Sequence, residues 1–317
     1  EKTSAMAARA SNGGARVVAA VNADFFWLTT GENENNQVLE GEWWKGVRVT
    51  DSPYDTWDNA HVQLALDALR RPSMGRYAFD GVAIAHGART PIITLNFFQP
   101  ANPEGTTLYT SRYGATTPRD TSRAIVEASL ISFGRHDDTL LFVRAGAVAS
   151  AGGSAIPPGG AVLSAYGAGV RATEVKALTE GDTVRVVLAT SPRVRPTLLI
   201  GGWPRLLADG KSVAGESAFI EGTISRNAEM KHPRTAIGYS RDGRTLYILA
   251  VDGRSTASVG LTLVELATVM RKLGAWNAMN FDGGGSTTMV IDGAVVNKPS
   301  DATGERAVGN ALMVVVR

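Results

Sequence analysis

Three consecutive glycines follow an acidic residue and precede hydroxyl residues in the stretch NFDGGGSTTMV, residues 280–290. Asp282 is a candidate nucleophile or base, and the glycines (283–285) can take backbone angles that are closed to other residues. Such a turn brings N–H groups close to an anion, as in an anion-binding nest, and Ser286 adds a hydroxyl donor. The stretch therefore predicts a site for a phosphate or a sugar oxygen. A flexible glycine-rich turn beside a solvated Asp is the alternative.

Established nucleotide and nucleophile motifs do not explain this stretch. A phosphate-binding P-loop needs Gly-Lys-Ser/Thr at the start of a helix, whereas this loop has no Lys and runs into a β-like segment. A serine nucleophile elbow needs a glycine two residues after the serine, where Thr288 stands. The histidines (61, 86, 136 and 232) show neither a triad context nor paired metal-ligand spacing. NTP hydrolysis, serine-hydrolase chemistry and a histidine-based metal centre are therefore not expected.

A cation and a second carboxylate come from the segments HPRTAIGYS (232–240) and VDGRS (251–255). Arg234 follows a proline in chain that should be extended, and its guanidinium can hold a phosphate or a carboxylate through two parallel hydrogen bonds. The predicted strand TLYILAVD ends at Asp252, so two strands each deliver an Asp followed by Gly. We therefore expect two carboxylates and a cation to converge. A surface ion pair is the alternative for Arg234.

Further polar candidates lie upstream and in a helical segment. The buried-type strand VVAAVNADFFW (17–27) carries Asn22, which can hydrogen-bond a sugar or an acetamido group, and Phe residues, which can present an apolar face to a pyranose. Asp24 is either functional or a turn residue. Glu265 lies in the otherwise apolar segment GLTLVELATVMRKLGA (260–275), either on the exposed face of a helix or pointed into the site.

These residues need strands to position them, and short β-rich segments dominate the chain. Strands are predicted at 16–26, 90–98, 138–146, 182–190, 245–253, 278–284, 287–297 and 310–317. Helices are predicted at 260–275, with Gly274 as a left-handed cap, and at 56–71, which Pro72 must end. The stretch 150–161 is expected to be a loop within one domain. We predict an α+β fold of mixed, mainly antiparallel β-sheets with a few packed helices, in a single catalytic domain spanning 1–317.

Composition limits the function classes. The 317 residues are 44% hydrophobic, which is enough for a sizeable core. Lys plus Arg (32) nearly balance Asp plus Glu (30), and a formal charge of +2 is no nucleic-acid or membrane-surface footprint. The absence of cysteine excludes disulfides, thiolate nucleophiles and cysteine-ligated metals. No apolar run of about 18 residues occurs, so we expect neither a membrane-spanning segment nor an intact signal peptide.

Together the segments resemble the phosphodiester glycosidase family. The resemblance follows the same order over nearly the whole chain and is most specific in the C-terminal half. It rests on VNADFF (21–26), LYTSRYGATT (108–117), GGWPRLLADG (201–210), HPRTAIG (232–238), VDGRSTASVGLTLVELA (251–267) and LGAWNAMNFDGGGSTTMVIDGAVVNKPSD (273–301). It implies hydrolysis of the bond between a sugar anomeric carbon and a phosphodiester oxygen, which releases an N-acetylglucosamine-like sugar and a phosphomonoester.

The resemblance also implies roles for individual residues. Positions that match the family's pattern are Asn22, Arg234, Asp252, Glu265, Asp282, Gly283, Gly284, Gly285, Ser286 and Asn297. Asp282 or Asp252 would act as nucleophile or base, with Glu265 as a reserve acid/base, while Arg234 and the glycine amides would neutralise the phosphate. Ser286 would bind phosphate, and Asn22 and Asn297 would position the sugar. Asp24 and Trp203 stand at variable positions and are expected to contact substrate rather than to catalyse.

Several alternatives stay open. A carboxyl separation of about 5 Å between Asp252 and Asp282 would favour retention, and roughly 7–9 Å would favour inversion. Rival activities are P–O cleavage by a phosphodiesterase, hydrolysis of a phosphate-free cell-wall or exopolysaccharide glycan, and glycan binding without catalysis. No cofactor or metal is expected, although Asp and Asn oxygens could hold a structural calcium ion. The expected partner is a small-molecule or glycan phosphodiester and not nucleic acid. The expected location, from the resemblance, is secreted or periplasmic.

Overall fold

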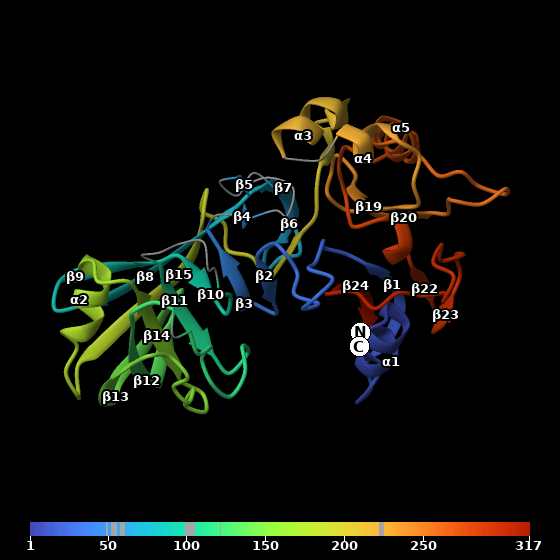
Figure 1. Ribbon diagram of the computed structural model, residues 1–317. Coiled ribbons are helices and arrows are strands. Elements are labelled where there is room, and N and C mark those ends of the chain that lie inside the picture. Colours follow the sequence, from blue (N-terminus) through green and yellow to red (C-terminus); the bar gives the residue numbers. More distant parts are fainter. Residues whose placement is uncertain (49, 52–55, 58–60, 99–104, 121, 222–224) are drawn as a thin grey trace. The chain divides into compact units, whose positions relative to one another are not determined.

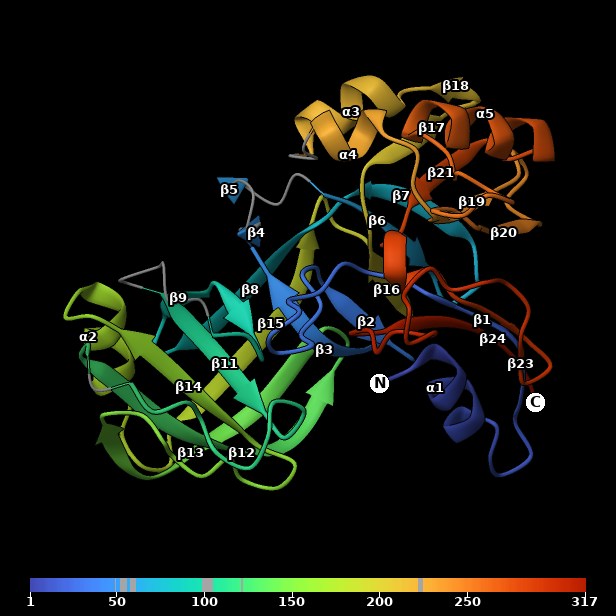
Figure 2. The ribbon, with the colours of Figure 1, turned by 45° about the vertical axis from the view of Figure 1, so that its right-hand side comes forward.

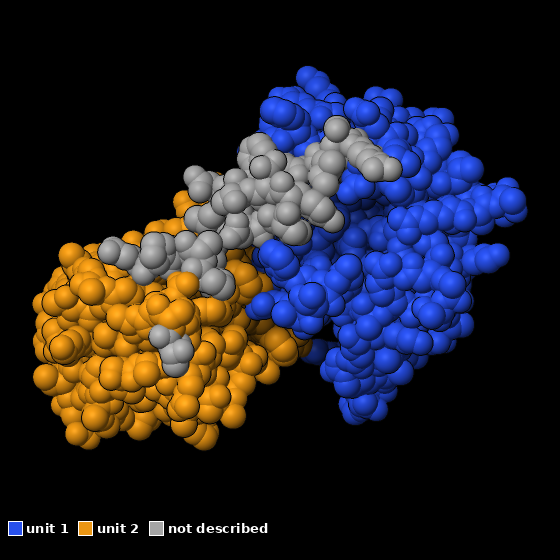
Figure 3. All heavy atoms as spheres, in the orientation of Figure 1, with its two compact units in different colours: residues 1–35, 50–76, 198–317 blue, residues 36–49, 77–197 orange. Residues whose placement is uncertain are grey.

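The chain forms two compact units. The structure, a computed structural model, describes residues 1–48, 50–51, 56–57, 61–98, 105–120, 122–221 and 225–317. Unit 1 comprises residues 1–35, 50–76 and 198–317, and unit 2 comprises residues 36–49 and 77–197 (Figure 3). Each unit is therefore assembled from segments that are distant in sequence.

The fold class matches the prediction from sequence. Strands outnumber helices, and nearly all of the described strand pairings are antiparallel, with β10 (Thr94–Leu95) and β11 (Thr106–Thr110) as a parallel pair (Figure 1). The α+β class of mainly antiparallel sheets with a few packed helices is thereby confirmed. The extent of one catalytic domain over 1–317 stays a prediction.

The first sheet of unit 1 joins the two ends of the described chain. Its strands, in spatial order, are β23 (Ala294–Val295), β22 (Met289–Ile291), β1 (Arg16–Asn22) and β24 (Ala311–Val316). Helix α1 (Thr3–Ala10) packs on it through Ala7, beside Val17 and Val290 (Figure 2). Strands β22 and β23 form a hairpin that turns at Asp292 and Gly293, which both have positive φ, 45° and 82°.

The second sheet of unit 1 carries the helices. Its strands, in spatial order, are β18 (Lys211–Ser212), β17 (Arg205–Ala208), β21 (Asn277–Asn280), β19 (Arg234–Tyr239) and β20 (Leu246–Val251). The helices are α3 (Ala214–Ile220), α4 (Ser225–Glu229) and α5 (Leu263–Leu273). Helix α5 buries Leu266 and Met270 in the cluster that includes Ala236 of β19, and it ends at Gly274 with φ 107°. The predicted helix at 260–275 and its left-handed cap are therefore confirmed (Figure 2).

The predicted helix at 56–71 is wrong. Two short strands occur at β4 (Thr50–Asp51) and β5 (Thr56–Trp57), and three more pair as β7 (Pro72–Arg76), β6 (Val62–Leu66) and β16 (Leu198–Gly201). Residues 58–60 lie outside the described part of the chain. The Asp67 carboxylate accepts hydrogen bonds from the backbone N–H groups of Leu69 and Arg71 and so closes a turn. Strand pairing on both sides of β6 outweighs the helical preference of its Leu and Ala residues.

The described part of unit 2 is a long, strongly paired sheet with one helix. Its strands, in spatial order, are β2 (Gln37–Leu39), β3 (Glu42–Val47), β10 (Thr94–Leu95), β11 (Thr106–Thr110), β14 (Ala161–Tyr166), β12 (Ile125–His136), β13 (Thr139–Ser150), β15 (Thr183–Ser191), β8 (Ala78–Ala85) and β9 (Ala88–Ile92). Helix α2 (Val170–Lys176) contributes Val175 to a core around Phe79 and Leu163. The predicted loop at 150–161 connects β13 to β14 within this unit.

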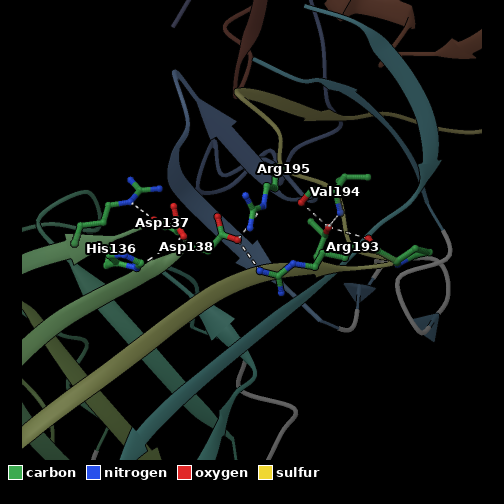
Figure 4. Close-up of polar contacts among 9 residues, drawn as sticks. His136, Asp137, Asp138, Arg193, Val194 and Arg195 are labelled. Carbon is green, nitrogen blue, oxygen red and sulfur yellow. Dashed lines mark hydrogen bonds and ion pairs between the residues drawn. The ribbon is translucent and has the colours of Figure 1, made fainter. Parts of the chain in front are cut away.

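A charged cluster holds the last segment of unit 2 after strand β15. The Asp138 carboxylate lies 2.6 Å from Nη2 of Arg193 and 3.5 Å from Nε of Arg195, and the Val194 N–H donates to Thr190 Oγ1 at 2.9 Å (Figure 4). Both arginine side chains are largely exposed, so each ion pair contributes little free energy.

Candidate functional site

A pocket of about 220 Å³ lies within unit 1 at the ends of strands β19 and β21. Its lining is rich in cationic and polar groups and contains a single carboxyl group among the described residues, that of Asp282. The lining residues are Phe25, Trp203, Pro204, Asn227, His232, Arg234, Arg254, Leu263, Asn280, Asp282, Gly283, Gly284, Gly285 and Arg306. The predicted residues that meet here are therefore Arg234, Asp282, the three glycines and Trp203.

Backbone hydrogen bonds lock the pocket's floor to three segments. The Asp282 N–H donates to the Ala23 carbonyl at 2.8 Å, just beyond β1, and the Phe281 N–H donates to the Thr235 carbonyl at 2.8 Å, in β19. The Gly284 N–H donates to the Pro233 carbonyl at 2.9 Å. The ends of β1, β19 and β21 are thus fixed together, although they are far apart in sequence.

The Asn22 side chain stabilises this junction through hydrogen bonds. Its Nδ2 donates to the Asp282 carbonyl at 2.6 Å, and its Oδ1 accepts from Thr235 Oγ1 at 2.7 Å and from the Thr288 N–H at 3.1 Å. The side chain is almost completely buried and does not line the pocket. The contacts support a positioning role for Asn22 and not the expected contact with sugar.

Asp282 is the acidic centre of the pocket. Desolvation raises the pKa of its carboxyl group to about 6, against the Ser286 hydroxyl, the Gly283 N–H and Arg306, which lower it, while Asp24 raises it further. The Gly283 N–H donates to Asp282 Oδ1 at 2.8 Å. At neutral pH the group is mostly ionised, yet its pKa is close enough to the operating pH for proton transfer. Ser286 is fully buried and does not line the pocket.

The three glycines permit close packing of the chain rather than presenting a row of free amides. A Cβ at Gly283 would lie 2.6 Å from the Pro233 carbonyl oxygen, and one at Gly285 would lie within 2.5 Å of the Asp301 and Arg306 side chains. Gly284 has φ 59°, a left-handed angle that favours glycine. The Gly283 and Gly284 N–H groups are already bonded within the protein, to Asp282 and Pro233. The expected nest of bare amides is therefore corrected for Gly283 and Gly284, whose N–H groups already have acceptors within the protein.

Arg234 is buried and held by backbone carbonyls. Its Nε donates to the Leu261 carbonyl at 3.0 Å, and its Nη2 donates to the carbonyls of Asn227 at 2.6 Å and Met230 at 3.1 Å. Burial, and then the positive charge of Arg254, lower the pKa of Arg234 to about 10, so it stays cationic at neutral pH. The predicted cation is thus in the pocket and firmly oriented.

Two further arginines complete the cationic lining, and the sequence interpretation did not single them out. Arg254 follows the predicted strand end at Asp252 and has φ 57°, which turns the chain back. Arg306 reaches the pocket from the loop before β24, where its Nε lies 2.8 Å from Asp301 Oδ2. Arg254 lies in the VDGRS segment, so its position close to Asp252 could have identified it. Nothing in the sequence near Arg306 connects it to the site.

Trp203 lines the pocket, but both faces of its indole are covered. The Phe25 ring centroid lies 3.8 Å from that of Trp203, and the His61 ring stacks at 3.7 Å with an interplanar angle of 11°. Since Trp203 is also almost fully buried, it cannot offer a free face to a sugar. Phe25, which is only partly buried, is the better apolar wall.

Asp252 lies outside the pocket lining, contrary to expectation. Its Oδ1 accepts hydrogen bonds from Asn297 Nδ2 at 3.2 Å and from the Lys298 N–H at 2.9 Å. Asn297 also donates to the Thr287 carbonyl at 3.0 Å and accepts from the Met289 N–H at 2.7 Å. Both side chains therefore brace the turn behind the glycine loop. The expected pair of carboxylates facing one cavity does not form, and the stereochemical inference from their separation has no basis here.

Glu265 also takes a structural position. Its Oε2 accepts from the Thr262 N–H at 2.9 Å, while the Glu265 N–H donates to Thr262 Oγ1 at 3.1 Å, which is a capping box at the start of α5. Lys231 Nζ lies 3.2 Å from Glu265 Oε1. The Glu265 side chain is 42% exposed and does not line the pocket, so the structure favours the exposed-face alternative over a carboxylate pointed into the site.

Asp24 organises a loop instead of lining the pocket. Its Oδ2 accepts from the Asn35 N–H at 2.9 Å and from Asn33 Nδ2 at 3.2 Å, and its Oδ1 accepts from Asn35 Nδ2 at 2.7 Å. These amide donors occupy both oxygens of the Asp24 carboxylate. Within the described ranges, no three His, Asp or Glu side chains gather as metal ligands. In the same ranges, the structure contains no helix with the length and apolarity needed to span a membrane.

The fold and the pocket together define a β-rich protein with a cationic site around one poised carboxyl group, an arrangement suited to an enzyme for an anionic substrate. The sequence model of the phosphodiester glycosidase family matches residues 137–315, more than half of the chain. The chain therefore belongs to this family of hydrolases.

Sequence relatives cover only part of the chain. The SPbeta prophage-derived protein YomE of Bacillus subtilis is 41% identical over 92 residues, which is 29% of this chain and 14% of that protein. The N-acetylglucosamine-1-phosphodiester alpha-N-acetylglucosaminidases of Mus musculus and Homo sapiens are each 36% identical over 110 residues, which is 32% of this chain and 21% of those proteins. The matched stretch thus spans about a fifth or less of these relatives.

Solved structures share the fold over the full chain. A protein of Synechocystis matches with a TM-score of 0.75 at 23% identity, covering 100% of this chain and 54% of that one. A protein of Burkholderia pseudomallei K96243 that is described as exported matches with a TM-score of 0.72 at 25% identity, covering 99% of this chain and 68% of that one. At 23% identity, the match to the Synechocystis protein indicates a shared fold and nothing more.

Proposed function

We propose that this protein hydrolyses the anomeric C–O bond of a sugar-1-phosphodiester and releases the sugar and a phosphomonoester. The observation that carries the proposal is the meeting of one desolvated carboxyl group, Asp282, with three arginines (234, 254 and 306) in one pocket. Family membership gives the reaction type, and the partial match to the mammalian enzymes makes an N-acetylglucosamine-like sugar the first candidate.

The positive charges of the pocket arginines suit a phosphate leaving group. As the anomeric C–O bond breaks, its electron pair goes to the phosphate oxygen and the phosphate gains negative charge. Fixed guanidinium groups in a partly dehydrated pocket stabilise that charge without reorganisation. A phosphomonoester held in this way needs less help from a general acid than an ordinary sugar alcohol does.

Asp282 is the proposed base or nucleophile. As a base it would take the proton of the water that attacks the anomeric carbon; as a nucleophile it would form a glycosyl ester that water then hydrolyses. The pocket offers no second carboxylate in the described residues, so Asp282 would carry out either role without Asp252 or Glu265. Because the pocket has one carboxylate among the described residues, substitution of Asp282 alone tests this role.

The sugar side of the pocket is the proposed place for Asn280 and Phe25. Asn280 is almost fully buried; its Nδ2 donates to the Trp203 carbonyl at 2.7 Å, while its Oδ1 has no hydrogen-bond donor among the described residues. That oxygen can accept from a sugar hydroxyl or an acetamido N–H, and Phe25 can pack on the ring. Asn280 replaces Asn22 and Asn297 as the amide that faces the substrate.

The test is a matched substrate panel in oxygen-18 water. Purified protein would be given N-acetylglucosamine-1-phosphate methyl ester, its glucose counterpart and the corresponding methyl glycosides without phosphate, with products identified by mass. We expect turnover of the phosphodiesters alone, with the label on the sugar. Label on the phosphate would show P–O cleavage, turnover of the plain glycosides would show an ordinary glycosidase, and binding without product would show a glycan-binding protein.

Location and partners are part of the proposal. We propose a secreted or periplasmic protein whose partner is a glycan or small-molecule phosphodiester, supported by the family and by the relative that is described as exported. Fractionation of the source cells with an antibody would test the location, and signal confined to the cytoplasm would contradict it. That the protein binds no nucleic acid stays a prediction.

A further inference from the structure

His232 lines the pocket, yet neither nitrogen of its ring has a hydrogen-bond partner among the described residues. Both nitrogens are shielded from solvent, so each gives up water without gaining a protein partner. A buried polar atom left in this way costs about 1–3 kcal/mol. Native structures rarely keep two such atoms in one side chain unless a ligand completes them.

The backbone of His232 is held firmly at the pocket wall. The His232 N–H donates to the Leu261 carbonyl at 3.2 Å, and the Leu261 N–H donates back at 3.0 Å. Gly260 is pressed against this segment so closely that a Cβ there would lie 2.2 Å from the His232 carbonyl oxygen. Rigid placement of an unsatisfied imidazole at a pocket wall indicates a ligand contact.

The charges around the ring come from several elements. Burial lowers the pKa of His232, and the charges of Arg234 and Arg254 lower it further, so the ring is neutral at pH 7 in the free protein. Asp282 and Arg306 line other walls of the same pocket. The neighbouring Lys231 is paired with Glu265. An anion bound between the two arginines would offset their repulsion of a proton on the ring, which adds to the effect of burial.

We propose that His232 contacts the phosphate group of the ligand together with Arg234 and Arg254, and that its imidazole takes up a proton when the phosphate binds. The inference rests on the proposed function for the identity of the ligand. In the proposed hydrolysis, water adds to the anomeric carbon, its proton passes to Asp282, and the C–O electron pair goes to the phosphate oxygen. The imidazolium would hydrogen-bond that oxygen as its charge rises.

Inorganic phosphate and dimethyl phosphate are the probes, because dimethyl phosphate keeps one negative charge across the pH range used. The four histidines of the chain (61, 86, 136 and 232) make imidazole NMR practical. The signal of His232 is assigned by its loss in His232→Gln. We expect either probe to raise the pKa of His232 by about one unit or more, a tenfold gain in proton affinity, while the signal of the exposed His136 does not move.

Calorimetry in the Asp282→Asn background separates His232 from the other titrating group. There, dimethyl phosphate should bind about tenfold more tightly at pH 5.5 than at pH 8, and adding His232→Gln should abolish this dependence, whereas adding His136→Gln should not. A His232 signal that ignores bound phosphate, a pH dependence that survives in the double variant, or the absence of any phosphate binding would each overturn the inference. Failure of sugar-phosphodiester turnover alone would overturn the proposed function and leave these results standing.

Discussion

The guanidinium of Arg254 lies against the backbone of Gly284, so closely that a Cβ at Gly284 would stand 3.0 Å from Arg254 Nη2. Gly284 in turn donates its N–H to the Pro233 carbonyl at 2.9 Å, next to Arg234. One glycine therefore fixes the distance between the acidic loop and two of the three pocket arginines.

Replacing Gly284 with Ala should damage the site more than the fold. The left-handed backbone angle makes any Cβ unfavourable by about 1–2 kcal/mol, and the Cβ would also displace Arg254. Gly293→Ala is the matched control, because Gly293 has φ 82° but no atom within 4 Å of a built Cβ. Both variants should lose similar stability in thermal unfolding, but turnover should fall about tenfold or more in Gly284→Ala alone. Equal turnover in the two variants would contradict the role of this contact.

Asp282→Asn should abolish turnover while the fold persists. Asn keeps an oxygen that can accept from the Gly283 N–H, but it can neither take a proton nor act as a nucleophile. We expect kcat to fall by about 10²–10⁴-fold, as is usual when a general base is lost. Steady-state kinetics on the sugar-1-phosphodiester measures this. Turnover close to wild type would remove Asp282 from the mechanism.

Relative to wild type, Asp282→Asn should become more stable as the pH rises. The carboxyl group of Asp282 has a pKa near 6 when folded, against 3.8 for its ordinary value, so the folded state binds more protons between these limits. Wild-type stability from this group is therefore full below about pH 4 and is lost as the pH rises through 6. The difference is at most roughly 3 kcal/mol, reduced by solvent at the pocket mouth.

Thermal melts from pH 4 to pH 8 test this prediction. The two proteins should melt alike near pH 4, and Asp282→Asn should melt at the higher temperature above pH 6. Glu221, whose pKa burial raises to about 7, is unchanged in both proteins and cancels in the difference. A difference that stays constant with pH would show that Asp282 is not desolvated.

Arg254→Ala should weaken substrate binding. Loss of a charged hydrogen-bond donor in a pocket removes about 1.5–3 kcal/mol, so KM should rise by roughly 10- to 100-fold. Arg193→Ala, at the surface of unit 2, is the matched loss of one positive charge and should change KM little. If both substitutions raised KM alike and added salt abolished the effect, the contribution would be long-range charge and not contact.

Glu265→Ala should affect stability and leave catalysis intact. The Glu265 carboxylate caps α5 together with Thr262 and lies outside the pocket lining. We expect a lower melting temperature with kcat/KM within about twofold of wild type. Thr262→Ala, which removes the other half of the capping box, should lower the free energy of unfolding by about 1 kcal/mol. A large loss of kcat in Glu265→Ala with an unchanged melting temperature would restore Glu265 as an acid/base candidate.

Local chemistry made much of the fold predictable from sequence. Alternating or apolar runs between Gly, Pro, Asn and Asp located strands such as β1, β13, β15, β20 and β24, and the apolar stripe with Gly274 at its end located α5. The predicted ranges left out others, including β6, β8, β12 and β14. The prediction for segment 56–71 failed because helical preference there is weak compared with strand pairing of β6 to the adjacent β7 and to β16. Strand β16 lies more than 100 residues further along the chain. Pairing partners at such separations leave no local pattern.

For the site, the sequence by itself determined that Asp282, the triple glycine and Arg234 would stand at strand ends, because each follows or begins a strand. Only the tertiary structure decided which polar side chains face the cavity. Asp252, Asn22, Asn297, Asp24 and Glu265 all bond to neighbouring protein groups, while Arg254, Arg306, His232 and Asn280 line the pocket. Residue type and spacing do not reveal direction, since the same carboxylate can cap a helix, brace a turn or meet a substrate. What settles the choice is which donors the packed chain brings within hydrogen-bonding distance.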